Sequence, residues 1–178
     1  ALVHIKTLTA SSSSTLSFVN GTDSVVLDST YPIYKFEFIN MHPASDGVAF
    51  YVNFRDGGSA YDATKTTTYF LSRNAEDNSS SELSYKTGQN VAQSTASQYL
   101  TVDSDNNNDS SQSGELFLFN PSSTTFVKHF IGRTINDPSG YAQDEYTAGY
   151  FNTTSAINAV QFKMGSGNID SGDICLYG

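Results

Sequence analysis

Residues 33–39, Ile-Tyr-Lys-Phe-Glu-Phe-Ile, indicate the fold class of this chain. The aromatic residues Tyr34, Phe36 and Phe38 point to one side of an extended segment, because successive side chains of a strand alternate between its two faces. The charged residues between them point to the other side. Residues 48–54, Val-Ala-Phe-Tyr-Val-Asn-Phe, repeat the same period of two. Such runs are typical of strands that bury one face and expose the other.

Similar alternation extends over most of the chain, and helical periodicity is nearly absent. The one weak helix candidate is Asn90–Ser97, which is short and holds poor helix formers. We therefore expect an all-β, single-domain antiparallel β-sandwich over residues 1–178, with about nine strands. This number of strands favours a jelly roll, and a barrel is the alternative. The expected strands are Val3–Leu8, Thr15–Val19, Ile33–Ile39, Val48–Phe54, Thr67–Leu71, Glu115–Phe119, Thr125–Ile131, Ile157–Met164 and Ile174–Tyr177.

Turn residues separate these segments. Asn20-Gly21 predicts a hairpin turn between Leu16–Val19 and Val25–Leu27, because Asn-Gly readily adopts the left-handed conformations of a tight turn. Asn120–Ser123, Asn-Pro-Ser-Ser, predicts a second hairpin connection. No stretch has the composition of a domain linker, and no internal repeat is present.

Composition limits the partners of the protein. The chain has 178 residues, a formal net charge of -9 and only 15% charged residues, against roughly 25% in an average protein. An acidic surface repels phosphate, so we expect neither nucleic acid nor anionic membrane lipid as a direct partner. No apolar run approaches the roughly 20 residues that a membrane-spanning helix needs.

The single cysteine, Cys175, excludes an intramolecular disulfide and any zinc site built on several cysteines. The first residues, Ala-Leu-Val-His-Ile-Lys, lack the basic and apolar regions of a signal peptide. Together these features predict a protein made in a reducing cytoplasm. Cys175 is expected to be a buried free thiol.

Catalytic motifs are missing: there is no nucleophile elbow, phosphate-binding loop or dinucleotide-binding glycine motif. Glu37 and Glu115 stand within strands and are the only candidates for the paired carboxylates of a glycosidase. We favour the simpler interpretation that both mark the solvent side of an alternating strand. Asp144-Glu145 is expected in a solvated loop. We therefore predict no enzymatic activity, no catalytic residues and no cofactor.

One stretch has the spacing of a calcium loop. Asp103–Asp109 places oxygen-bearing side chains at alternate positions, but Asn108 and Gly114 stand where an EF-hand has its turn glycine and its closing glutamate. No helices are expected beside it. We favour a solvated loop and predict no metal site.

The candidate binding site is a tyrosine-rich cluster. It consists of Tyr141, Asp144, Tyr146, Tyr150 and Phe151. Aromatic faces stack on sugar rings, and carboxylates accept hydroxyl protons. A cell-surface glycan is therefore one possible ligand. A tyrosine-rich edge buried between subunits explains the same residues equally well.

Segments spread over most of the chain resemble a group of small, jelly-roll-like structural proteins (decoration or fibre-like) from the virions of marine tailed bacteriophages. The resemblance concerns strands and turns, so it implies no active-site residue. It is carried by His4–Ala10 with the serines that follow, Tyr31–Asn40, Gly114–Ser123, Ala156–Val160 and, most specifically, the ending Ser166–Gly178.

The resemblance implies a component of the virion, made in the cytoplasm of the bacterial host. Our leading hypothesis is a non-enzymatic structural protein that decorates or cements the capsid surface, with the major capsid protein or other virion proteins as partners. We expect a homo-oligomer, and a trimer in particular, because icosahedral lattices offer three-fold positions. The alternative is a carbohydrate-binding receptor module of a phage tail or tail fibre. A glycosidase or lyase on the same fold is the third hypothesis.

Overall fold

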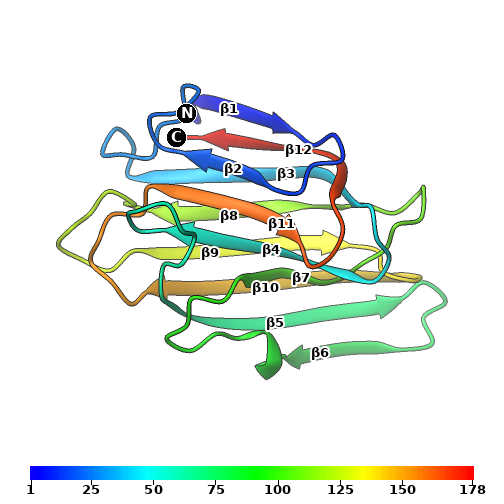
Figure 1. The fold of residues 1–178 in the computed structure, drawn as a ribbon. Coiled ribbons are helices and arrows are strands. Elements are labelled where there is room, and N and C mark those ends of the chain that lie inside the picture. The colour runs from blue at the N-terminus through cyan, green and yellow to red at the C-terminus, as the bar shows by residue number, and fades with distance from the viewer.

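The alternating segments build two antiparallel sheets that pack face to face in a computed structural model describing residues 1–178 (Figure 1). The larger sheet has eight strands, in the order β1 (His4–Thr9), β12 (Ile169–Tyr177), β3 (Ile33–Pro43), β8 (Gln112–Phe119), β9 (His129–Asn136), β10 (Tyr141–Phe151), β5 (Lys65–Ala75) and β6 (Ser81–Tyr85). The smaller sheet has four strands, in the order β2 (Leu16–Val19), β11 (Ala159–Met164), β4 (Val48–Arg55) and β7 (Gln98–Ser104). The expected all-β sandwich is therefore confirmed.

The chain crosses repeatedly between the two sheets. Strands β1-β12-β3-β8 of the larger sheet lie opposite β2-β11-β4-β7, an order compatible with the predicted jelly roll. Two further hairpins, β9–β10 and β5–β6, extend the larger sheet beyond this unit. Both termini lie together at the β1–β12 edge (Figure 1), where the Val3 N–H donates to the Gly178 carbonyl at 2.8 Å.

The core lies between the sheets and is rich in phenylalanine. Phe162 of β11 is its centre, with ring centroids 5.2 Å from Phe38, 5.5 Å from Phe36 and 6.0 Å from Phe50. All four side chains are at most 2% exposed. Aromatic side chains at such distances contribute both large buried area and favourable ring contacts. The alternation in residues 33–39 thus places its three aromatic residues inside, as expected.

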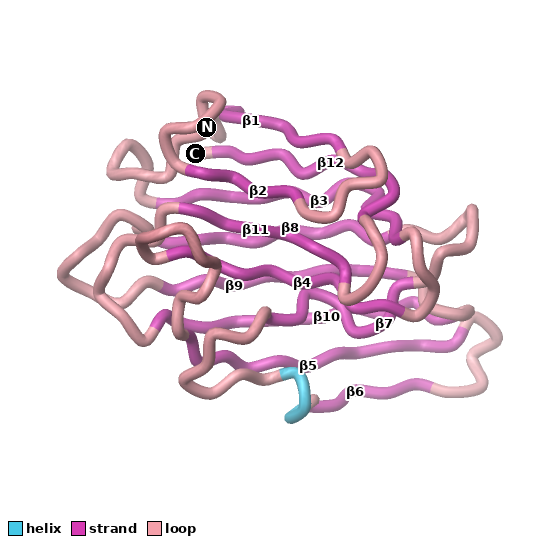
Figure 2. Tube along the Cα trace, in the orientation of Figure 1, coloured by secondary structure: helices cyan, strands magenta, loops and turns pink.

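The structure has twelve strands where about nine were expected. Sequence analysis missed β6, β7 and β10, and it predicted a strand at Val25–Leu27 that does not form. Asn90–Ser97 is not helical; the short 3₁₀-helix η1 (Thr87–Gln89) precedes it and appears as the single cyan segment in Figure 2. No helix has the length and apolar character needed to cross a membrane.

Candidate functional site

The larger sheet buries one face against the smaller sheet and leaves the other open. Strand register aligns one side chain from each of its eight strands in a single row across the open face. The row runs Thr7, Cys175, Glu37, Glu115, Arg133, Tyr146, Phe70 and Tyr85. We call this surface the open face.

Large apolar side chains are exposed on the open face. They belong to five neighbouring strands and are 37–77% exposed: Ile33 and Ile39 of β3, Ile131 and Ile135 of β9, Tyr150 of β10, Phe70 of β5, and Leu83 and Tyr85 of β6. Monomeric soluble proteins rarely expose a large contiguous apolar patch unless it binds something. The open face is therefore the leading candidate for an interaction surface.

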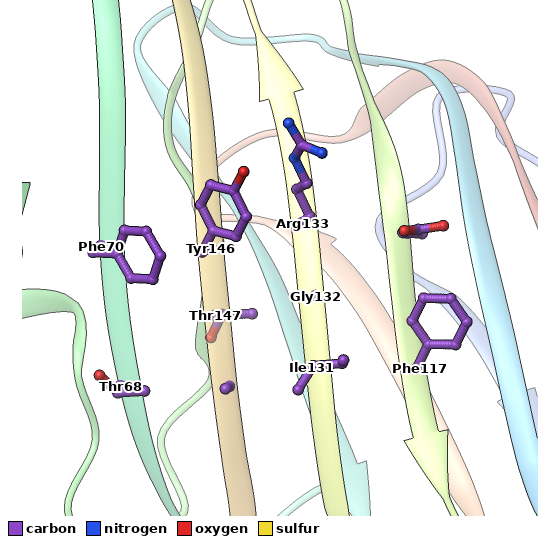
Figure 3. Close-up of a pocket in the computed structure, with 10 residues that line it drawn as sticks. Thr68, Phe70, Phe117, Ile131, Gly132, Arg133, Tyr146 and Thr147 are labelled. Atoms are coloured by element: carbon purple, nitrogen blue, oxygen red, sulfur yellow. The ribbon is translucent and has the colours of Figure 1, made fainter. Parts of the chain in front are cut away.

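A hollow of about 300 Å³ lies in the middle of the open face. It forms where Ala148 and its cross-strand neighbour Thr68, two small residues, stand among larger ones. We call it the Ala148 hollow. Ten residues line it: Thr68, Phe70, Glu115, Phe117, Ile131, Gly132, Arg133, Tyr146, Thr147 and Ala148 (Figure 3).

Two aromatic rings form one wall of the hollow. Phe70 and Tyr146 are cross-strand neighbours, and their rings are nearly parallel, with an interplanar angle of 5° and centroids 4.7 Å apart. In Figure 3 these two rings lie side by side, and Phe117 lies on the opposite wall beyond Ile131. The rings and the isoleucine leave a mainly apolar interior.

Charged groups stand at the rim. The Arg133 guanidinium lies 5.2 Å from the Tyr146 ring centroid and donates two hydrogen bonds to Asp144, from Nε at 2.9 Å and from Nη2 at 2.7 Å. The Tyr146 hydroxyl also donates to Asp144, at 2.9 Å. The hydrogen bonds from Arg133 lower the pKa of Asp144, and the hydrogen bond to Asp144 raises the pKa of Tyr146. Asp144 is therefore ionised, and it orients both neighbours.

A second ionic group lies beside the hollow. The Lys35 ammonium contacts Glu37 at 2.8 Å and Glu115 at 2.9 Å, and it lies 5.4 Å from the Phe117 ring centroid. Burial lowers the pKa of Lys35, but the two carboxylates outweigh it and the pKa is raised. Glu37 and Glu115 occupy the open face, as the alternating pattern predicted. They share one ammonium group, an arrangement that relieves the repulsion between two adjacent carboxylates.

The structure divides the predicted tyrosine-rich cluster between two faces. Asp144, Tyr146 and Tyr150 point to the open face. Tyr141 lies on the opposite side of β10, where the Arg73 guanidinium sits 4.9 Å from its ring centroid. Phe151 is fully buried in the core against Phe54 and Phe130, so its inclusion in a binding site is corrected.

The expectation that Asp144-Glu145 forms a solvated loop is wrong. Both residues lie within β10, and Glu145 points into the interior with 1% exposure. The strand was missed because its inward side chains include Gln143, Glu145 and Thr147, which break the usual apolar pattern. Burial raises the pKa of Glu145 to about 9, so this side chain is protonated at neutral pH.

Sequence reasoning also missed most of the hollow. Phe70, Phe117, Ile131 and Arg133 come from three strands and converge only through strand register. The available signal was the alternation in β9, where the isoleucines occupy the positions opposite to Phe130. A pattern of that kind predicts the isoleucines or the phenylalanine to be inside, but not both.

Other candidate chemistry does not assemble. No group of three or more histidine, cysteine, aspartate or glutamate side chains is placed to hold a metal ion. Within the suspected calcium loop, Asp105 instead accepts hydrogen bonds from the backbone N–H and hydroxyl of Ser139. Cys175 is a free thiol, 8% exposed, on the open face, where it accepts a hydrogen bond from the Thr7 hydroxyl at 3.3 Å.

Comparison with known proteins adds no family to this geometry. The sequence matches no protein-family model and no curated protein. Any function must therefore be argued from the open face itself. Its apolar patch, its hollow and its charged rim are suited to binding, because apolar area supplies affinity and a few placed polar groups supply orientation.

Proposed function

We propose that this chain is a non-enzymatic structural protein of a bacteriophage virion that decorates or cements the capsid surface. The open face is the observation that carries the proposal. A protein built for permanent assembly buries such a surface against its neighbours, and large interfaces are rich in aromatic residues, methionine and arginine. Phe70, Tyr146 and Arg133 around the hollow fit that composition.

The fold and sequence are compatible with this role. The similarity of strand and turn segments to phage structural proteins suggests the virion, where major capsid protein and other virion proteins are the expected partners. One sandwich domain without a repeat is suited to a surface subunit and lacks the shaft of a fibre. Synthesis in the host cytoplasm agrees with the single cysteine.

The copy number of this chain in purified phage particles tests the proposal. Quantitative mass spectrometry against the major coat protein gives that number. A copy number comparable to that of the coat protein is expected for a protein that decorates the shell. A far lower number would overturn the decorating role and move the chain to the tail or a vertex. Its absence from particles would overturn the virion assignment altogether.

A carbohydrate-binding receptor module is the second candidate. The Ala148 hollow favours it, because the parallel rings of Phe70 and Tyr146 stand beside Arg133 and Glu115. Aromatic rings stack on the apolar faces of sugars, while charged side chains bond the hydroxyl groups.

A glycan array probed with the wild type and with Ala148→Trp tests this second candidate. The tryptophan fills the hollow from its floor, so a sugar held there loses its place. Ala142→Trp is the matched control, because Ala142 lies on the same strand and faces the same side but does not line the hollow. A signal that survives Ala148→Trp, or no signal at all, would count against a sugar in the hollow.

A further inference from the structure

The loop between β8 and β9 presents an aromatic side chain to solvent. Phe126 is 71% exposed, and the neighbouring Val127 is 37% exposed. In Figure 1 this yellow-green to yellow loop projects past the ends of the sheets. An exposed phenylalanine alone is ordinary, but this one stands on a loop that the rest of the chain holds in place.

Hydrogen bonds hold the loop. The Phe126 N–H donates to the Ser123 hydroxyl at 3.2 Å, and the Asn120 N–H donates to the Pro32 carbonyl at 2.7 Å. The ammonium of the buried Lys128 donates to the Phe126 carbonyl at 3.4 Å and to the Thr153 carbonyl at 3.1 Å. A side chain displayed on such a loop loses little conformational entropy when it binds.

The Ala148 hollow fits this side chain in size and character. Its volume of about 300 Å³ admits a phenyl ring with room for part of the loop, and Phe70, Tyr146, Ile131 and Phe117 line it. Aromatic pairs of this kind are favourable beyond the area that they bury.

The charges around the two surfaces are complementary. The exposed cation at the rim of the hollow is Arg133, whose side chain is 58% exposed, whereas its partner Asp144 is 20% exposed. Beside the Phe126 loop lies the carboxylate of Asp56, close enough to the Lys128 ammonium to oppose the effect of burial on its pKa. A loop with an adjacent carboxylate is attracted to a hollow with an adjacent guanidinium.

We propose that Phe126 of one copy of this chain occupies the Ala148 hollow of a second copy. This inference builds on the proposal that the open face is buried in an assembly, and it names the partner. The contact joins two different surface patches, so each copy offers one projecting side chain and one hollow. Repetition of such a contact produces a closed oligomer, in agreement with the homo-oligomer expected from the sequence.

Sedimentation velocity at micromolar concentrations tests the contact. We expect the wild type to sediment above its monomer mass of 19.3 kDa. Phe126→Ser and Ala148→Trp should each weaken association at least about tenfold, since each removes one half of a central aromatic contact. The matched control Ala142→Trp should associate as the wild type does. Circular dichroism should be the same for all four proteins, because every changed side chain lies outside the core.

A mixture of the two weakened variants is the decisive sample. Phe126→Ser retains the hollow and Ala148→Trp retains the phenylalanine, so the mixture should form a complex that neither variant forms alone. A monomeric wild type would overturn the proposal, and so would a mixture that stays monomeric. If only Ala148→Trp has an effect, and on glycan binding alone, the hollow holds a sugar and the proposal fails. Self-association of a chain that is absent from phage particles would leave this inference standing and refute the virion function.

Discussion

The side chain of Glu145 in β10 accepts a hydrogen bond from the backbone N–H of Val102 in β7, with 3.0 Å between Oε2 and N. This contact joins the two sheets where the interior is polar. Gln143 donates to the other oxygen of Glu145 at 2.8 Å, and Gln112 accepts from the Thr101 hydroxyl at 2.8 Å. Here hydrogen bonds replace the phenylalanine packing found elsewhere in the core.

Glu145 should make stability depend on pH. Its pKa of about 9 in the folded protein lies above the unfolded value near 4.5, so the folded state retains a proton that the unfolded state releases. Stability from this group is complete below about pH 4.5 and is lost as pH rises toward 9. The slope is at most about 1.4 kcal/mol per pH unit. Urea unfolding at pH 6 and pH 7.5 measures it.

Glu145→Gln is the matched variant, because glutamine has the same shape and does not ionise. We expect it to unfold with a smaller dependence on pH than the wild type does, and to be the more stable of the two at pH 7.5. The buried Lys65, with a pKa lowered by burial to about 8, titrates mainly above this range. Parallel stability curves for the two proteins would show that Glu145 is already ionised when folded.

Gly149 is required by close packing inside the larger sheet. A Cβ at this position would stand 2.7 Å from Thr67 Cγ2 and 2.8 Å from Phe130 Cζ. Gly149→Ala should therefore destabilise the protein by about 1–3 kcal/mol, the usual cost of overpacking. Gly88→Ala is the control, since nothing lies within 4 Å of its added Cβ. Equal midpoints of chemical unfolding for the two variants would contradict this account.

The Arg133–Asp144 ion pair should matter more for the rim of the hollow than for stability. Because the Arg133 side chain is 58% exposed, Arg133→Gln should change the free energy of unfolding by less than about 1 kcal/mol. The same variant should raise the pKa of Asp144, which Arg133 lowers in the wild type. Carboxyl-detected NMR titration follows that group directly. An unchanged titration of Asp144, or a loss of several kcal/mol, would refute this reading of the rim.

The fold class was predictable from the sequence because several strands bury one face only. Residues 33–39 alternate aromatic and charged side chains, and β3 places them as expected. Strand β10 was not predictable in this way, since its inward residues Gln143 and Glu145 are polar and satisfied by hydrogen bonds from within the fold. Local hydropathy carries no information about such tertiary partners.

The site was predictable only in part. Asp144 and Tyr146 were identified as neighbours in sequence, and the structure brings them together by a hydrogen bond of 2.9 Å. Phe70 and Arg133 flank Tyr146 on the adjacent strands, although both are distant from it in sequence. Strand order and register determine these neighbours, and no spacing in the sequence reveals either. The hollow itself arises from Ala148, a residue with no chemical signal of its own.

The occupancy of phage particles by variants of this chain tests the central claim most directly, namely that the open face holds the protein in a virion. Purified wild type, Ala148→Trp and Ala96→Trp are added to particles that lack the chain, and bound copies are counted by mass spectrometry. Ala96 is exposed in the loop before β7, away from the open face. We predict that wild type and Ala96→Trp bind in equal number and that Ala148→Trp binds far less. Equal binding of all three, or no binding of the wild type, would contradict the account.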